Sequence, residues 1–178
     1  MDSFVEEVLL DHKEIVEICK RLGEKITADY QGKRPILVGL LKGSVPFLAE
    51  LIKHIKCELE IDFMQASSYE GTKSKGTVMV IKDLITPVVG RHLLLVEDIV
   101  DTGLTLHEVM NLLQDRGAAS IEIVTLLDKP SGRKLEITPK YIGHTIPNKF
   151  VIGFGLDYNE IYRNLDYIGV LKESVYKK

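Results

Sequence analysis

The stretch LLLVEDIVDTGLT, residues 93–105, indicates most clearly how the chain folds. Its first four residues are a continuous apolar run, which is typical of a strand buried on both faces of a parallel sheet. Carboxylates follow at Glu97, Asp98 and Asp101, and beyond the turn apolar residues recur at helical spacing through Leu113. A strand that passes through a polar turn into a helix predicts an α/β fold, in which ligands bind at the carboxyl ends of the strands.

The same alternation of apolar runs and amphipathic segments extends along the chain in both directions. Apolar runs predict further strands over residues 36–41, 59–63, 78–81, 121–127, 150–154 and 167–171. The run at 59–63 alternates apolar and acidic residues, which predicts a half-exposed strand. Asp11 and Glu14 form a candidate capping pair at the start of the first helix. Helical spacing predicts helices over about 15–26, 47–55, 106–113 and 159–165.

Composition narrows the class of protein. The 178 residues suggest a single domain, residues 1–178, and 45% hydrophobic with 28% charged residues is typical of a soluble globular protein. The net charge of −3 disfavours a strongly basic nucleic-acid-binding protein. Cys19 and Cys57 lack the spacing of a metal or redox motif, and neither a targeting signal nor an apolar membrane segment is found. We therefore expect a cytoplasmic protein with no nucleic-acid or membrane partner.

The turn after residues 93–96 has the chemistry of a sugar-phosphate site. Backbone N–H groups at a helix start, together with the Thr102 and Thr105 hydroxyls, suit a phosphate. Glu97 and Asp98 would repel a phosphate but suit a diol or Mg²⁺. The alternative interpretation is a solvated acidic turn that caps the helix, which explains Thr102 but not the packed carboxylates.

Four segments carry a resemblance to a known family. Residues 96–105 resemble the phosphoribosyl pyrophosphate signature of the type I phosphoribosyltransferases. Three further parts of the chain are similar to segments of the hypoxanthine-guanine phosphoribosyltransferases. LLKGS at 40–44 resembles their pyrophosphate loop, and SSY at 67–69 resembles the start of their catalytic loop. IPNKFVIGF at 146–154, together with DYNE at 157–160, resembles their purine pocket. In that family the peptide bond equivalent to Leu41–Lys42 can adopt the cis form.

The resemblance covers nearly the whole chain, from about residue 36 to 171. It implies the type I phosphoribosyltransferase fold: a central, mostly parallel sheet flanked by helices, with a small hood built from the N-terminal residues and about residues 145–178. It also implies purine salvage, the transfer of the 5-phosphoribosyl group from phosphoribosyl pyrophosphate to hypoxanthine or guanine, with Mg²⁺ as cofactor. A homodimer or homotetramer is expected on the same grounds.

The resemblance further implies a role for each residue of the acidic turn. Asp101 is the expected general base at the purine N7 position, and the alternative is that it only caps the following helix. Glu97 and Asp98 would bind the ribose hydroxyls, directly or through Mg²⁺, unless they are a surface acidic pair. Leu104 departs from relatives with a basic residue here, which leaves the phosphate to backbone amides and hydroxyls. The expected 5-phosphate site comprises Asp101, Thr102, Gly103, Leu104 and Thr105.

The purine and pyrophosphate sites are also implied by the resemblance. Lys129 would donate to the exocyclic O6, which favours a 6-oxopurine over adenine, and Phe150 would stack on the base; the alternatives are an exposed lysine and a core phenylalanine. The expected purine contacts are Ile99, Lys129, Phe150, Val151 and Asp157. The expected pyrophosphate contacts are Leu41, Lys42, Gly43, Ser68, Tyr69 and Arg163.

Two further expectations concern metal and closure. Asp157 would join Glu97 and Asp98 as a metal ligand by holding a second Mg²⁺, and the alternative for Asp157 is a helix N-cap. The polar loop at about 66–77 is interpreted as a mobile lid that keeps water from the activated sugar.

Other functions stay open from the sequence. A regulator that senses phosphoribosyl pyrophosphate would share the phosphate turn, but this chain also has Asp101, Lys129 and Phe150 at positions that match the base pocket. A xanthine- or guanine-preferring transferase would differ around the purine 2-position, near Val151 and Asp157. We expect hypoxanthine to be preferred, then guanine, with xanthine a poor substrate.

Overall fold

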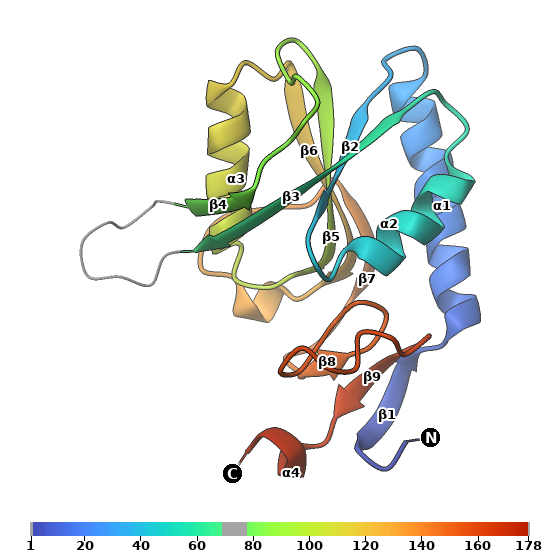
Figure 1. Cartoon of the computed structure of the whole chain (residues 1–178). Helices are drawn as coiled ribbons and strands as arrows, with labels where there is room; N and C mark the ends of the chain where they lie inside the picture. The colour runs from blue at the N-terminus through green and yellow to red at the C-terminus, as the bar shows by residue number, and fades with distance from the viewer. Residues whose placement is uncertain (1, 69–77, 178) are drawn as a thin grey trace.

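The computed structural model describes residues 2–68 and 78–177, and Figure 1 shows a large sheet above a smaller one. The large sheet has the strand order β4-β3-β2-β5-β6-β7, and every neighbouring pair is parallel except β3 with β4. This is the mostly parallel α/β architecture that the sequence predicts. The strands are β2 (Ile36–Leu40), β3 (Glu60–Ser68), β4 (Val78–Lys82), β5 (His92–Val100), β6 (Ser120–Asp128) and β7 (Tyr141–Thr145).

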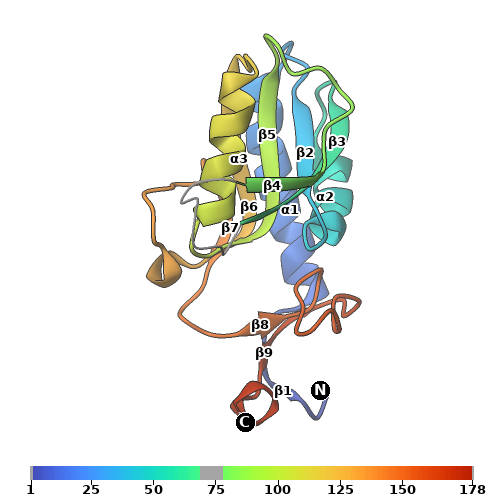
Figure 2. The ribbon, with the colours of Figure 1, turned by 60° about the vertical axis from the view of Figure 1, so that its left-hand side comes forward.

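Helices cover both faces of the large sheet (Figures 1 and 2). Leu94 and Val96 of β5 belong to the apolar cluster under α1 and α2, whereas Leu93 and Leu95 belong to the cluster under α3. The predicted strand buried on both faces is therefore confirmed. The helices are α1 (His12–Tyr30), α2 (Val45–Leu51), α3 (Leu104–Asp115) and α4 (Glu173–Tyr176), with 3-10 turns η1 (Ile52–His54) and η2 (Pro130–Gly132). Within residues 2–68 and 78–177, no helix is long and apolar enough to cross a membrane.

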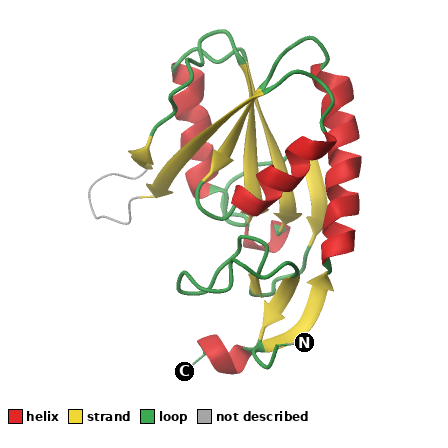
Figure 3. Ribbon diagram, turned by 45° about the vertical axis from the view of Figure 1, so that its right-hand side comes forward, coloured by secondary structure: helices red, strands yellow, loops and turns green. Residues whose placement is uncertain are grey.

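A small antiparallel sheet forms a hood from the two ends of the chain, below the carboxyl ends of the parallel strands (Figure 3). Its strands, in order, are β1 (Val5–Leu10), β9 (Ile168–Leu171) and β8 (Val151–Ile152). Neither β1 nor β7 is predicted from the sequence. Each interrupts its apolar residues with charged or small polar ones, as in VEEVLL and YIGHT, so the run of apolar residues is too short to be distinctive.

The chain between β8 and β9 is a series of turns, so the short helix predicted over 159–165 is wrong. Asn159, Glu160 and Tyr162 have φ values of 51°, 67° and 77°. These left-handed values are incompatible with a right-handed helix. Strand β8 is likewise shorter than the predicted 150–154.

Helix ends follow the local signals in the sequence. The Glu14 N–H donates to Asp11 Oδ1 at 2.9 Å, and the Asp11 N–H donates to Glu14 Oε2 at 2.8 Å, which completes a capping box at α1. Gly117, with φ 84°, follows the C-cap residue Arg116 and ends α3 in the left-handed conformation that glycine adopts readily.

Strand β3 turns an acidic residue inward. Asp62 is 6% exposed whereas its apolar neighbour Ile61 is 41% exposed, which reverses the usual relation between hydrophobicity and burial. The Asp62 carboxylate accepts hydrogen bonds from the backbone N–H groups of Ile85 and Thr86, each at 2.8 Å, and so holds the segment after β4. Burial opposes ionisation of Asp62, but these bonds and one from the Phe63 N–H outweigh it and hold the pKa below its ordinary value.

We expect Asp62→Asn to lower the free energy of unfolding by about 2 kcal/mol at neutral pH, since hydrogen bonds to a charged group are worth roughly 1.5–3 kcal/mol. A carboxyl whose pKa is lowered by folding stabilises the protein above its unfolded-state pKa of about 4, and this stabilisation disappears as the pH falls through the folded-state pKa. Urea unfolding across this range should therefore show the two proteins converging in acid. A constant difference at all pH values would contradict this role of Asp62.

Candidate active site

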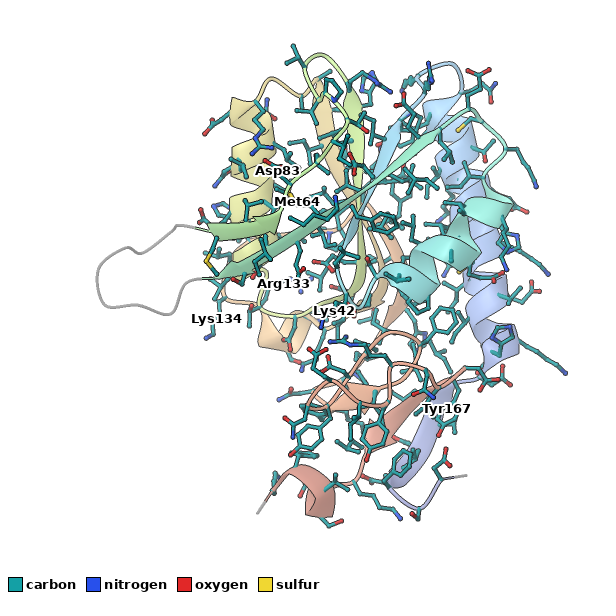
Figure 4. The ribbon with its side chains drawn as sticks, viewed as in Figure 1. Lys42, Met64, Asp83, Arg133, Lys134 and Tyr167 are labelled. Carbon is teal, nitrogen blue, oxygen red and sulfur yellow. The ribbon has the colours of Figure 1, made fainter. Side chains whose placement is uncertain are left out.

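The groups expected to carry chemistry lie at the carboxyl ends of β2, β5 and β6, where the large sheet faces the hood. Figure 4 places Lys42 and Arg133 at this end of the sheet. Lys42 Nζ, from the loop after β2, lies 2.8 Å from Glu160 Oε2 in the hood turn. Lys129 Nζ, after β6, lies 2.8 Å from Asp101 Oδ2, after β5. Segments far apart in the sequence therefore converge on one site.

Strand β5 continues past its apolar run to Val100, so the partly buried carboxylates Glu97 and Asp98 lie within the strand near its carboxyl end. Both line a cavity of about 280 Å³ that also borders Gly43 and Thr105. Burial raises the pKa of Glu97 well above its ordinary value, and the charge of Asp98 adds to this effect. Burial raises the pKa of Asp98 to about 6, although a hydrogen bond from the Ile99 N–H opposes the shift. Since desolvation and like charge disfavour the ionised forms here, a hard divalent cation would reverse both effects.

The turn after β5 leads directly into α3, as predicted. Gly103 has φ 80° and serves as the N-cap, so α3 begins at Leu104. Residues 101–105 line a hollow of about 160 Å³ at this helix N-terminus. Backbone N–H groups at a helix start are suited to bind a phosphate. The Leu104 side chain is exposed and brings no charge to the turn.

Asp101 and Lys129 form an ion pair at 2.8 Å, with side chains that are 40% and 14% exposed. The Lys129 N–H also donates to the Val100 carbonyl at 3.0 Å, which ties the two segments together. Gly132 packs on the same carboxylate, since a Cβ there would lie 1.6 Å from Asp101 Oδ1. The alternative that Asp101 merely caps α3 is not favoured, because the N-cap is Gly103 and no side chain makes the capping bond.

The loop after β2 is held between β5 and the hood. Its Leu41–Lys42 peptide bond is cis. A Cβ at Gly43 would lie 1.7 Å from Asp98 Oδ2, and a Cβ at Gly155, which has φ 99°, would lie 1.9 Å from the Gly43 carbonyl oxygen. A side chain at either glycine would push these layers apart. The backbone of this loop therefore contacts a site carboxylate on one side and the hood on the other.

Two of the residues expected to bind pyrophosphate, Lys42 and Arg163, contact one carboxylate in the hood turn through their side chains. Glu160 Oε2 lies 2.8 Å from Lys42 Nζ, and Glu160 Oε1 lies 3.2 Å from Arg163 Nη2. Arg163 also pairs with Asp157 Oδ1 at 2.9 Å and donates to the Gly155 carbonyl at 2.7 Å. The structure thus brings Lys42, Arg163 and Asp157 together across the site.

Besides Lys129 and Asp157, the residues expected to contact the base are Ile99 in β5, Val151 in β8 and Phe150 directly before β8. Phe150 is 38% exposed, stacks on Tyr176 with ring centroids 5.0 Å apart, and meets Tyr158 edge-on at 5.8 Å. This exposure favours a binding role for Phe150 over core packing. Val151 is buried in β8, and Ile99 is half-buried in β5.

The three carboxylates expected to bind metal do not form a metal centre on their own. In the part of the chain that the structure describes, no three His, Cys, Asp or Glu side chains are placed to hold an ion together. Glu97 and Asp98 are adjacent, whereas Asp157 is paired with Arg163.

The expected lid falls largely outside the described residues. Residues 66–68 belong to β3 rather than to a loop, so Ser68 ends a strand. Tyr69 and the rest of the segment through residue 77 lie outside the described residues.

Two residues at the site are not predicted from the sequence. Glu160 is part of the DYNE segment, but no pattern indicates that it pairs with both Lys42 and Arg163. Arg133 donates to the Val100 and Asp101 carbonyls from behind the acidic turn. The only sequence signal for Arg133 is its place in the short segment after β6.

Comparison with known proteins agrees with this geometry. Residues 6–159 match the family model for the phosphoribosyl transferase domain. The chain is 60% identical to a hypoxanthine-guanine phosphoribosyltransferase from Lactococcus lactis (strain IL1403), over 100% of this chain and 97% of that protein. It is 55% identical to one from Streptococcus pneumoniae (strain R6), over 99% and 98% of the two proteins.

Solved structures give the same result. A crystal structure of a hypoxanthine phosphoribosyltransferase from Staphylococcus aureus has a TM-score of 0.94 at 53% identity, covering 98% of this chain and 96% of that one. A Trypanosoma cruzi hypoxanthine phosphoribosyltransferase in a ternary substrates complex has a TM-score of 0.93 at 38% identity, covering 98% of this chain and 100% of that one. With its fold, its acidic turn and full-length matches of this kind, the chain belongs to the hypoxanthine-guanine phosphoribosyltransferases of the phosphoribosyl transferase domain family.

Proposed function

We propose that this chain transfers the 5-phosphoribosyl group from phosphoribosyl pyrophosphate to hypoxanthine and guanine. The bond from purine N9 to C1′ forms, the bond from C1′ to the pyrophosphate oxygen breaks, and the proton on N7 passes to the Asp101 carboxylate. The products are the 6-oxopurine nucleotide and pyrophosphate. The observation that carries this proposal is the ion pair between Asp101 and Lys129 beside the turn that leads into α3.

The spacing of this pair matches one edge of a 6-oxopurine. O6 and N7 are adjacent on the same edge of the base, and the Asp101 and Lys129 side chains lie 2.8 Å apart. Lys129 can donate to O6 while Asp101 accepts the proton from N7. Adenine places an amino group where O6 would be, so two donors would face each other and binding would be disfavoured. Phe150 and Ile99 would cover the faces of the base, and Val151 and Asp157 would present groups to its far edge.

Proton removal and phosphate binding are separate tasks within the acidic turn. A positioned general base is worth about 10²–10⁴-fold in rate. The residues from Asp101 to Thr105 would bind the 5-phosphate through the amides at the start of α3 and the threonine hydroxyls. This division lets one turn anchor the sugar phosphate and act on the base.

Glu97 and Asp98 fit a magnesium site. Mg²⁺ prefers oxygen ligands, keeps several waters, and is usually bound by one or two carboxylates together with substrate phosphates. That preference agrees with two adjacent carboxylates and does not require a third protein ligand. When bound, Mg²⁺ would neutralise charge on the pyrophosphate leaving group. Glu97 and Asp98 would hold it next to the ribose hydroxyls, and Asp157 remains a candidate ligand for a second ion.

The pyrophosphate would bind on the other side of the cavity. We assign it to the backbone of Leu41, Lys42 and Gly43 and to the Arg163 guanidinium, whose planar donors suit phosphate oxygens. Ser68, at the end of β3, and Tyr69 complete the assignment, and we keep the proposal of a lid only for the residues after β3, through about 77. Glu160 would have to release the Arg163 guanidinium, and an ion pair with so exposed a carboxylate costs little to break.

Three broader features accompany the proposal. We infer a preference for hypoxanthine, then guanine, with xanthine poor. Cys19 and Cys57 are free and buried, which supports the reducing, cytoplasmic location expected from the sequence. A homodimer or homotetramer is inferred from the family alone.

We expect Asp101→Asn to lower kcat for nucleotide formation by about 10²–10⁴-fold, because the base is lost while the phosphate site is kept. Binding of phosphoribosyl pyrophosphate, measured by calorimetry, should stay close to wild type. Asp115→Asn makes the same change at the exposed far end of α3 and serves as the control. Unchanged turnover in Asp101→Asn would remove Asp101 as the base.

Lys129→Ala should raise the KM for hypoxanthine by about 10–100-fold, because a hydrogen bond to a charged group is worth roughly 1.5–3 kcal/mol. The KM for phosphoribosyl pyrophosphate should change far less. Lys134→Ala removes an exposed lysine from the same loop and should leave both constants unchanged. Equal increases in both constants for Lys129→Ala would contradict its role in reading O6.

An ultraviolet assay with each of hypoxanthine, guanine, xanthine and adenine tests the activity itself. Nucleotide should form from hypoxanthine and guanine but not from adenine, and removal of Mg²⁺ with a chelator should abolish the reaction. A rate that survives chelation would refute the role given to Glu97 and Asp98. No product from any base, with phosphoribosyl pyrophosphate still bound, would favour a regulator instead.

A further inference from the structure

Arg133 contacts the backbone of the turn that carries Asp101, and its side chain is only 15% exposed. Figure 4 shows it at the end of the large sheet that faces the hood. Its Nη1 donates to the Val100 carbonyl at 2.5 Å and to the Asp101 carbonyl at 2.8 Å. Its Nε donates to the Ile137 carbonyl at 3.1 Å, and its Nη2 pairs with the Asp128 carboxylate. All three guanidinium nitrogens are therefore engaged.

These partners connect the two segments that carry the expected chemistry. Val100 ends β5 and Asp101 follows it, whereas Asp128 ends β6 and directly precedes Lys129. The Val100 carbonyl also accepts from the Lys129 N–H at 3.0 Å. The Arg133 guanidinium thus joins the end of β5 to the end of β6. It thereby holds the backbone from which the Asp101 carboxylate projects.

The charge on Arg133 is needed as well as its shape. Asp128 is 6% exposed, so its carboxylate would be left buried and unpaired without the guanidinium, which is costly. Lysine would keep the charge, but its single ammonium cannot reproduce a rigid, planar set of five donors. Arg133 donates to three backbone carbonyls and one carboxylate, which lie in different directions. Only a planar group with several donors can reach all four.

We propose that Arg133 is a positioning residue for the general base. It holds the Val100–Asp101 backbone against β6 so that the Asp101 carboxylate meets N7 of the purine, without touching the substrate itself. This inference rests on the base role given to Asp101 under the proposed function.

A double-mutant cycle with Asp101 tests the inference. Arg133→Met should lower kcat by about 10²-fold, since misplacing a catalytic group by about 1 Å costs on that order. The same change in an Asp101→Asn enzyme should cost less than about 3-fold, because residues that act as a unit are strongly non-additive. Calorimetric binding of phosphoribosyl pyrophosphate, compared across the four proteins, confirms that each one is folded.

Two further variants sharpen the test. Arg116→Met removes another arginine–aspartate pair, with Asp83 at 2.7 and 2.8 Å, away from the site, and should keep full turnover. Arg133→Lys keeps the charge beside Asp128 and should fold even if Arg133→Met does not. It should show the same dependence on Asp101 with a smaller loss in kcat.

The outcomes separate this inference from the proposed function. Equal losses in the wild-type and Asp101→Asn backgrounds would show that Arg133 supports the fold and not the base, which overturns the inference. Full turnover of Arg133→Met would overturn it too. If Asp101→Asn alone kept full turnover, Asp101 would not be the general base. The positioning role of Arg133, which depends on that base, would then be overturned as well.

Discussion

Strand β5 is buried on both faces, and its apolar residues alternate between the cluster under α1 and α2 and the cluster under α3. Because it lies between β2 and β6 in the sheet, its register is set by parallel pairing on both sides. This pairing fixes the position of the residues that follow the apolar run, at the carboxyl end of the central strand. Glu97 and Asp98, which lie within β5, are therefore placed by the packing of their own strand, and Asp101 follows directly after it.

The hood completes the site because the chain permits very close approach there. Gly43 rests against the Asp98 carboxylate, and Gly155 rests against the Gly43 backbone, so neither contact leaves room for a Cβ. The hood turn then brings Glu160 into contact with Arg163 and with Lys42, which stands next to the cavity-lining residues Leu41 and Gly43. Substrate binding between sheet and hood would exchange these protein ion pairs for pairs with pyrophosphate, which links the polar contacts of the hood to the chemistry proposed for the site.

The parts of the fold that depend on local pattern could be predicted from the sequence. The apolar run at 93–96, the capping pair Asp11–Glu14 and the glycine after α3 each act over a few residues. Other features depend on distant partners. Asp62 is buried because the N–H groups of Ile85 and Thr86 reach it, and no alternation of apolar residues contains that information.

The site shows the same division. The acidic turn could be predicted because its carboxylates, hydroxyls and glycine all lie within residues 97–105. The hood turn could not be predicted, because the residues that adopt its left-handed conformation, Asn159, Glu160 and Tyr162, are not glycines and so give no signal in the sequence. The role of Arg133 depends on three backbone carbonyls, which have no side-chain signature in a sequence.

The account depends most on the claim that Asp101 and Lys129 read one edge of the purine. A crystal structure of the protein with hypoxanthine, Mg²⁺ and a non-reactive carbocyclic analogue of phosphoribosyl pyrophosphate would test it most directly. The account predicts O6 within hydrogen-bond distance of Lys129 Nζ and N7 within hydrogen-bond distance of the Asp101 carboxylate, with both residues close to their positions in the free protein. A base bound with another edge toward this pair, or outside the cavity at the end of β5, would contradict it.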